Sequence, residues 1–160
     1  MIPLRLADYI EGRAPDFPIP RLTVNVHFES ARMGLPIIST YSEAAFVDTG
    51  SPFVIIPHSV HCQGFLRIRQ DFGRKPYRVL SETGEYLTQP FAEIGIHFLV
   101  RRPDGRLEFE PEPDVPVKAY LLEPGIRPTG RVIVGLETLY ENFVLHLEKP
   151  EAYLRLRGQP

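Results

Sequence analysis

The sequence has a single cysteine, Cys62, among its 160 residues. One cysteine cannot form a disulfide within the chain, so we expect a protein of a reducing compartment. No apolar run approaches the roughly 18 residues of a membrane-spanning helix, and residues 1–8 lack the sustained apolar core of a signal peptide. The sequence therefore predicts a soluble, cytoplasmic protein that does not bind membranes.

An excess of basic charge is also missing. The chain carries 18 Lys and Arg residues against 20 Asp and Glu residues, for a formal net charge of -2. A nucleic-acid-binding surface needs clustered positive charge, so we do not expect nucleic acid as a partner. The hydrophobic share of 43% and the charged share of 24% are ordinary for a globular protein that buries a core within one domain.

Proline and glycine are plentiful, with 17 and 12 residues, and they favour turns over long helices. The prolines of residues 14–20 predict an extended, surface-lying segment. We therefore divide the chain into an N-terminal extension, residues 1–20, and a single domain, residues 21–160. Strict alternation predicts half-buried strands over residues 21–28 and 92–98, and a further short strand over 117–122.

One stretch presents a carboxylate at the end of an apolar segment. Residues 44–47 are apolar, Asp48 follows, and Thr49-Gly50-Ser51 form a turn before a second apolar run at 52–57. A buried strand thus delivers an acid to the point where the chain bends, beside two hydroxyls and a permissive glycine. Taken alone, the same residues are also typical of an ordinary Asx turn at a strand end.

A second block raises the first above an ordinary turn. Val132, Ile133 and Val134 form an apolar run between Arg131 and Gly135, a short helix is expected over 136–142, and a strand over 143–147. Together the two blocks resemble the aspartic proteases of the retropepsin type, including their retrotransposon and bacterial branches. The resemblance runs from about residue 21 to residue 147 and is specific at these blocks. It implies an all-β fold, a closed β-barrel of the acid-protease kind with one short C-terminal helix.

The resemblance also implies a chemistry. Two carboxylates about 3 Å apart share a proton, so that one activates a water while the other protonates the peptide carbonyl, without metal or cofactor. The chain has one Asp-Thr-Gly, so the pair requires a homodimer that contributes Asp48 twice across a two-fold axis. Thr49 would bond across the axis to its twin's backbone, Gly50 would place a carbonyl near the substrate backbone, and Ser51 would donate to the outer oxygen of Asp48.

The family's substrate contacts can also be carried over to matching positions. Phe46, Phe53 and Ile133 would line side-chain pockets and favour apolar residues around the cut. Two positions depart from the viral pattern, because Pro52-Phe53 replaces acidic residues that grip the substrate backbone and Arg131 replaces an apolar pocket residue.

Residues 79–87 predict two short strands around a turn at Thr83-Gly84. Their order in the chain is similar to that of the retropepsin flap, which closes over an extended peptide through strand-like hydrogen bonds. The flap residues would be Ser81, Glu82, Thr83, Gly84, Glu85 and Tyr86. Viral flaps are glycine-rich and this one has a single glycine, so a plain structural hairpin is the alternative.

Four further stretches have competing interpretations. His58, His61 and Cys62 invite a metal site, but no second ligand cluster exists, so we expect a strand-to-loop segment with a buried thiol. The basic stretch 67–78 is expected to be a solvated face, with an acidic partner as the alternative. The acidic, proline-rich stretch 108–114 is expected to be an exposed loop or edge, or else to contact a partner or that basic stretch. Residues 153–157 alternate and are a candidate strand for the dimer sheet.

The sequence therefore predicts a dimeric aspartic endopeptidase that hydrolyses peptide or protein substrates. A non-catalytic peptide-binding or scaffold module that kept the fold is the alternative. A globular β domain with an unrelated role is the third hypothesis.

Overall fold

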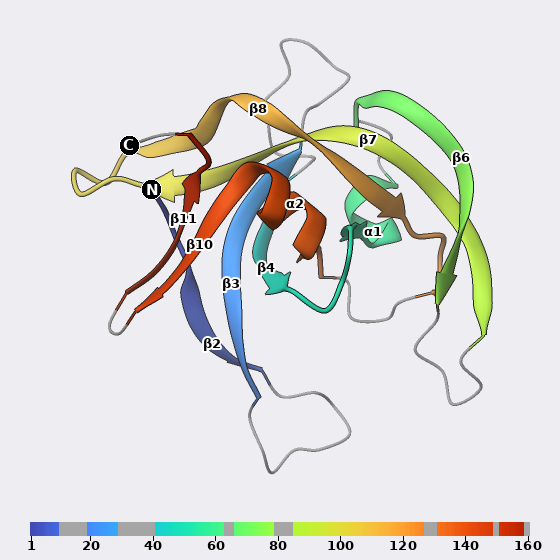
Figure 1. Cartoon of the computed structure of the whole chain (residues 1–160), viewed down its shortest axis with the longest axis horizontal. Coiled ribbons are helices and arrows are strands. Elements are labelled where there is room, and N and C mark those ends of the chain that lie inside the picture. Colours follow the sequence, from blue (N-terminus) through green and yellow to red (C-terminus); the bar gives the residue numbers. More distant parts are fainter. Residues whose placement is uncertain are drawn as a thin grey trace.

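The computed structural model describes residues 1–9, 19–28, 41–62, 66–78, 85–126, 131–148 and 151–158, and all structural statements concern these ranges. Within these ranges the chain is mostly β-strand, as the sequence predicts, and it forms two sheets and two short helices (Figure 1). In the described ranges, neither helix is long and apolar enough to cross a membrane.

The larger sheet has eight strands in the order β2-β3-β4-β9-β5-β8-β7-β6, and β3 also pairs with β7. The pairings therefore form a closed ring of six strands, β3, β4, β9, β5, β8 and β7. Strands β2 and β6 lie outside this ring. Their bounds are β2 (Arg5–Tyr9), β3 (Ile19–Phe28), β4 (Tyr41–Asp48), β5 (Val54–Ile56), β6 (Ile68–Arg78), β7 (Tyr86–Arg101), β8 (Leu107–Leu121) and β9 (Ile133–Gly135).

The smaller sheet has three strands in the order β1-β11-β10, namely β1 (Ile2–Pro3), β11 (Glu151–Leu156) and β10 (Phe143–Glu148). It brings the two chain ends together on one side of the molecule (Figure 1). Helix α2 (Leu136–Asn142) lies where the sequence predicts the C-terminal helix. A one-turn helix, α1 (His58–His61), is additional.

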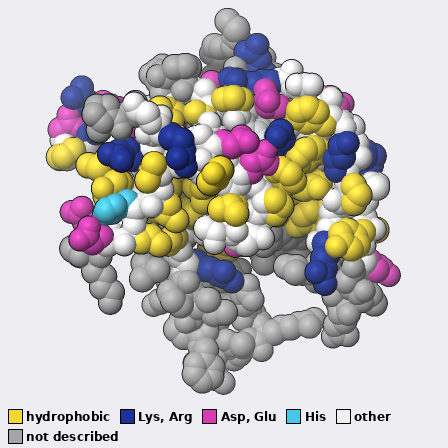
Figure 2. All heavy atoms as spheres, viewed as in Figure 1, with side chains coloured by type: hydrophobic (Ala, Val, Ile, Leu, Met, Phe, Trp, Pro, Cys, Tyr) yellow, Lys and Arg dark blue, Asp and Glu magenta, His cyan; other side chains and the backbone are white. Residues whose placement is uncertain are grey.

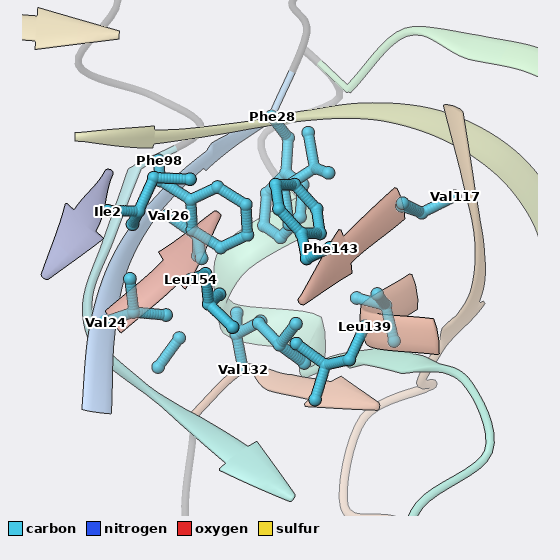
Figure 3. Packing of buried hydrophobic residues seen from close by; sticks show 14 of the residues in the cluster. Ile2, Val24, Val26, Phe28, Phe98, Val117, Val132, Leu139, Phe143 and Leu154 are labelled. Atoms are coloured by element: carbon cyan, nitrogen blue, oxygen red, sulfur yellow. The ribbon is translucent and has the colours of Figure 1, made fainter. Parts of the chain in front are cut away.

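The main core lies between the two sheets (Figure 3). Phe98 of β7 meets Phe143 of β10 edge to face, with ring centroids 5.2 Å apart. The alternation predicted for β3 and β7 is confirmed, because their inward positions are buried in this core. These positions are Val24, Val26, Phe28, Ile94, Ile96 and Phe98, and Ala92 of β7 is buried as well.

The N-terminal residues are part of the sheets, which corrects the expected extension over residues 1–20. Ile2 and Leu4 are 3% and 8% exposed and belong to the main core. They alternate with Pro3 and Arg5, so β1 can pair with β11 while its apolar side chains face inward. The proline-rich part, residues 10–18, lies outside the described residues.

The acidic stretch 108–114 is not a loop, because it lies within the long strand β8. The β7–β8 register jumps from Phe98↔Glu110 to Ile96↔Val115, so residues 111–114 leave the ladder as a bulge. Proline lacks the N–H that a ladder needs, and two of these four residues are prolines. Asp114 forms an ion pair with Arg69 at 2.7 Å, so the acidic stretch does contact the basic stretch.

The basic stretch forms β6, an outer strand of the larger sheet, and its side chains are mostly exposed. Strands β6 and β7 make one long hairpin that is paired as far as Arg78↔Tyr86. The strands of this hairpin therefore extend far beyond the two short ones predicted around Thr83-Gly84. Figure 2 shows basic, acidic and hydrophobic side chains interspersed over one face of the molecule.

The thiol of Cys62 is exposed at the end of α1, which corrects the expectation of a buried thiol. Residues 58–61 wind into a helical turn, closed by the Cys62 N–H donating to the carbonyl of His58 at 2.8 Å. This turn directs the thiol outward, and its Sγ lies 3.7 Å from the carbonyl oxygen of Ser59.

Candidate active site

The Asp48 turn joins β4 and β5, two strands that do not pair with each other. Strand β9 lies between them, parallel to β4 through Phe46↔Ile133 and Asp48↔Gly135. It is antiparallel to β5 at Ile55↔Ile133. The run Val132–Val134 is buried, as suits a strand covered on both faces. The two sequence blocks, far apart in the chain, thus become neighbouring strands.

The Asp48 carboxylate is half-buried and closes its own turn. Its Oδ1 accepts a hydrogen bond from the Gly50 N–H at 2.9 Å, and the Ser51 N–H donates to the Asp48 carbonyl at 3.2 Å. Thr49 and Gly50 are exposed at the tip. The Asx-turn geometry is therefore present, and it holds a carboxylate at the surface of a rigid scaffold.

Gly135 supports the turn from behind. A Cβ at this position would lie 2.3 Å from the carbonyl oxygen of Phe53 and 2.7 Å from that of Ser51. The first two N–H groups of α2 donate to the same turn, Leu136 to the Ser51 carbonyl at 2.6 Å and Glu137 to the Pro52 carbonyl at 2.8 Å. A helix N-terminus has unpaired N–H groups to offer, so the turn and α2 satisfy each other.

Ser51 does not make the contact expected of it. Its Oγ donates to the carbonyl of Phe53 at 3.0 Å, whereas the resemblance implies donation to the outer oxygen of Asp48. The backbone of residues 51–53 folds back against Gly135, which brings the Phe53 carbonyl close to the hydroxyl. In this arrangement Ser51 stabilises the turn and does not bond the carboxylate.

An apolar cluster lies beside the turn, on the side of Phe46. Phe46 and Ile133, predicted as pocket residues, are register partners and lie in this cluster. The cluster also contains Ile55 and Leu122, with Tyr77, Tyr120 and Ile126 packed against it.

Phe53 packs in an adjoining aromatic group. Its ring centroid is 4.9 Å from that of Phe91 and 5.9 Å from that of Tyr120. Tyr120 belongs to both groups, so it connects Phe53 to the cluster of Phe46 and Ile133. The sequence predicts no role for Tyr120. Its local pattern shows only an aromatic residue within a short apolar strand.

Arg131 lies over this cluster. Its guanidinium carbon is 5.4 Å from the centroid of the Phe46 ring, within reach of a cation–π interaction. The structure therefore brings Arg131 together with Phe46 and Ile133, as the motif positions imply.

The β6/β7 hairpin is attached to the same cluster. The Tyr120 hydroxyl donates to the carbonyl of Pro76 at 2.7 Å, and the rings of Tyr120 and Tyr77 are 5.2 Å apart. Burial, and secondarily the nearby Tyr77, raise the pKa of Tyr120. Glu85 and Tyr86 are exposed on the hairpin, and Tyr86 is 67% exposed. The other predicted flap residues, Ser81, Glu82, Thr83 and Gly84, lie outside the described residues.

The C-terminal strand is not placed to pair with another chain. Strand β11 lies in the middle of its sheet, with β1 on one edge and β10 on the other. This corrects the expectation that residues 153–157 form the dimer sheet. Strand β10 covers one edge of β11 along its whole length, from Phe143↔Leu156 to Glu148↔Glu151, and β1 pairs with the other edge at Tyr153 and Leu154.

No protein-family model matches the chain, and no curated protein matches its sequence. The local chemistry is that of one carboxylate on a fixed turn, beside an apolar cluster against which Tyr77 of the β6/β7 hairpin also packs. A single carboxylate can act as an acid or as a base, but one step of peptide hydrolysis needs both.

Proposed function

We propose that the protein is an aspartic endopeptidase that works as a homodimer. The observation that carries the proposal is the insertion of β9 between β4 and β5, which places Gly135 and the start of α2 directly behind the Asp48 turn. This support holds a carboxylate in place against an apolar cluster, as a reactive group requires. The exposed thiol of Cys62 suits a reducing compartment, so we place the protein in the cytoplasm.

The reaction needs the Asp48 carboxyls of two copies to share one proton. The ionised carboxylate takes a proton from a water, whose oxygen attacks the peptide carbonyl carbon, while the protonated carboxyl gives its proton to the carbonyl oxygen. Return of a proton to the amide nitrogen then allows the C–N bond to break. The two carboxyls titrate as one unit, so the pH profile belongs to the pair.

The surroundings of Asp48 favour an extended peptide with apolar side chains. Phe46 and Ile133 belong to the apolar cluster beside the turn, and Tyr77 of the β6/β7 hairpin packs against the same cluster. The hairpin would add strand-like backbone hydrogen bonds to the peptide. Arg131 at the border of the cluster gives one subsite a cation.

Strand β10 is the edge on which we expect the second copy to pair. Val144 and Leu147 are exposed apolar residues on it. The Arg157 N–H donates to the Asn142 carbonyl at 2.8 Å, so by alternation the backbone groups of Leu145 and Leu147 point to the open edge. Antiparallel self-pairing of β10 would bring Glu148 of one copy toward the Arg157 end of the other, with opposite charges facing.

Two other strands at sheet edges, β1 and β6, are less suitable for pairing with a second copy. Strand β1 has two residues, one of them a proline. Strand β6 is interrupted between Asp71 and Arg74 and carries Pro76, and such features discourage edge pairing. Strand β10 follows α2 directly, and the first N–H groups of α2 bond the Asp48 turn. An interface on β10 would therefore be connected to that turn through one short helix.

The test is cleavage of a mixed peptide library between pH 3 and 7 by wild type and by Asp48→Asn. Asp71→Asn is the matched control, because its Oδ1 accepts the Gly73 N–H at 2.7 Å in the same kind of turn. We expect cuts next to apolar residues in wild type and in Asp71→Asn, none in Asp48→Asn, and inhibition by pepstatin. Equal cleavage by Asp48→Asn would refute the proposal.

A non-catalytic peptide-binding module is the second candidate. The observation in its favour is the Ser51 hydroxyl, which bonds the Phe53 carbonyl and leaves the carboxylate without the donor that the resemblance implies. This candidate predicts a dimer that binds apolar peptides and cleaves none. Sedimentation of the protein with labelled library peptides measures dimer formation and peptide binding.

A further inference from the structure

A buried amide lies at the base of the β6/β7 hairpin. Gln89 of β7 is 1% exposed, although a buried glutamine is costly unless its polar atoms are bonded. Its Oε1 accepts the Glu123 N–H at 2.8 Å, and its Nε2 donates to the Thr88 carbonyl at 2.9 Å and to Glu123 Oε2 at 3.4 Å. Gln89 therefore joins the hairpin to the segment that follows β8.

Arg74 of β6 reaches the same point. Its Nη1 donates to Glu123 Oε1 at 2.7 Å, and its Nη2 donates to the Thr88 carbonyl at 2.6 Å. The hydrogen bond from Arg74 lowers the pKa of Glu123, and the same bond raises the pKa of Arg74. Both hairpin strands are thus tied to Glu123, one through a buried amide and one through an ion pair.

Glu123 is one residue from the apolar cluster beside Asp48. Leu122 is buried in that cluster with Phe46 and Ile133. Its N–H donates to the Ile56 carbonyl at 2.9 Å, and its carbonyl lies 2.9 Å from His61 Nε2. The side chain, the N–H and the carbonyl of Leu122 therefore each fix this segment in place. A hairpin tied to the segment is thereby fixed relative to the Asp48 turn.

We propose that Gln89 and Glu123 are positioning residues that fix the β6/β7 hairpin relative to the Asp48 turn. Tyr86 and Leu87, which are exposed on β7 beyond this junction, are then the described hairpin residues that contact substrate. The inference rests on the proposed peptidase function. It assigns these two residues a role in substrate binding that neither their burial nor the resemblance implies.

The test compares Gln89→Leu and Glu123→Ala with wild type in steady-state peptide cleavage. We expect each to raise KM by about fivefold or more while kcat stays within about twofold, because a displaced hairpin weakens substrate binding and leaves the carboxyl pair intact. Glu123→Gln keeps an oxygen acceptor and is expected to restore a KM within about twofold of wild type. Gln70→Leu is the control, since Gln70 is an exposed glutamine on β6.

Amide hydrogen exchange gives a readout that does not depend on catalysis. We expect the amides of residues 86–88 and of Glu123 to exchange about tenfold faster in Gln89→Leu than in Gln70→Leu. An unchanged KM in both Gln89→Leu and Glu123→Ala would overturn the proposal, even if melting temperatures fell. If wild type cleaves nothing, the peptidase function fails, and unchanged exchange would then also refute the anchoring of the hairpin.

Discussion

Replacement of Gly135 by alanine is the most direct test of how the site is supported. Gly135 has φ -87° and ψ 174°, an extended conformation that alanine adopts without strain. Any cost must therefore come from space. The added methyl would lie 2.3 Å from the Phe53 carbonyl oxygen, where ordinary contacts begin near 3.4 Å, so the turn backbone must retreat by about 1 Å.

The expected cost follows from these contacts. Overpacking of a well-packed site costs about 1–3 kcal/mol, and the two hydrogen bonds from α2 to the turn are each worth about 1 kcal/mol net. We expect Gly135→Ala to lower the free energy of unfolding by about 3 kcal/mol, or the melting temperature by roughly 6–12 °C. A shift of about 1 Å at a reactive group can cost about 100-fold in rate, so cleavage should fall by that order.

Urea denaturation and peptide cleavage measure the two effects. Gly105→Ala is the control, because Gly105 has φ +86° and no atom lies within 4 Å of the place where its Cβ would be. It should lose roughly 1–2 kcal/mol from backbone strain alone and keep full cleavage. The reasoning is refuted if Gly135→Ala unfolds within about 0.5 kcal/mol of wild type and cleaves normally.

Three further predictions concern single contacts. Ser51→Ala should lower the free energy of unfolding by about 1 kcal/mol, since it removes the hydrogen bond to Phe53, and should leave the pH profile of cleavage in place; a shifted profile would contradict this. Burial lowers the pKa of His61 from its ordinary 6.5, so the unfolded chain binds its proton first and stability falls as the pH drops below 6.5. His61→Gln should flatten this part of a urea-denaturation pH series, and an unchanged slope would count against it. Leu147→Lys should abolish dimers in sedimentation, while the equally apolar and exposed control Leu107→Lys should not; a persistent dimer would exclude the β10 edge.

Local patterns in the sequence predict those elements whose one face is buried. The alternation in β3 and β7 and the apolar run of β9 each report a covered face, and all three lie in the core. The apolar-apolar-Gly block and the Asp48 block form neighbouring, parallel strands in the structure. The two blocks meet through long-range packing between β4 and β9, which no local pattern reports. In the sequence, the resemblance to a family motif is what relates the two blocks.

Other features could not be read from local patterns. Strand β6 is exposed along nearly its whole length, so no apolar alternation marks it. The partner of the Ser51 hydroxyl depends on how the turn packs against Gly135, a contact made across most of the chain. The tie between Gln89 and Glu123 joins a strand to a loop, and a lone glutamine within a strand gives no sign of its partner.

The position of β9 has a consequence for the order of events during synthesis. Asp48 emerges from the ribosome well before the strand that stands between β4 and β5, and α2 follows that strand directly. Contacts of such long sequence separation form late and slowly in folding. A growing chain that ends before Gly135 therefore carries its aspartate on an unsupported loop, and the turn gains its support only after β9 and the start of α2 have been made.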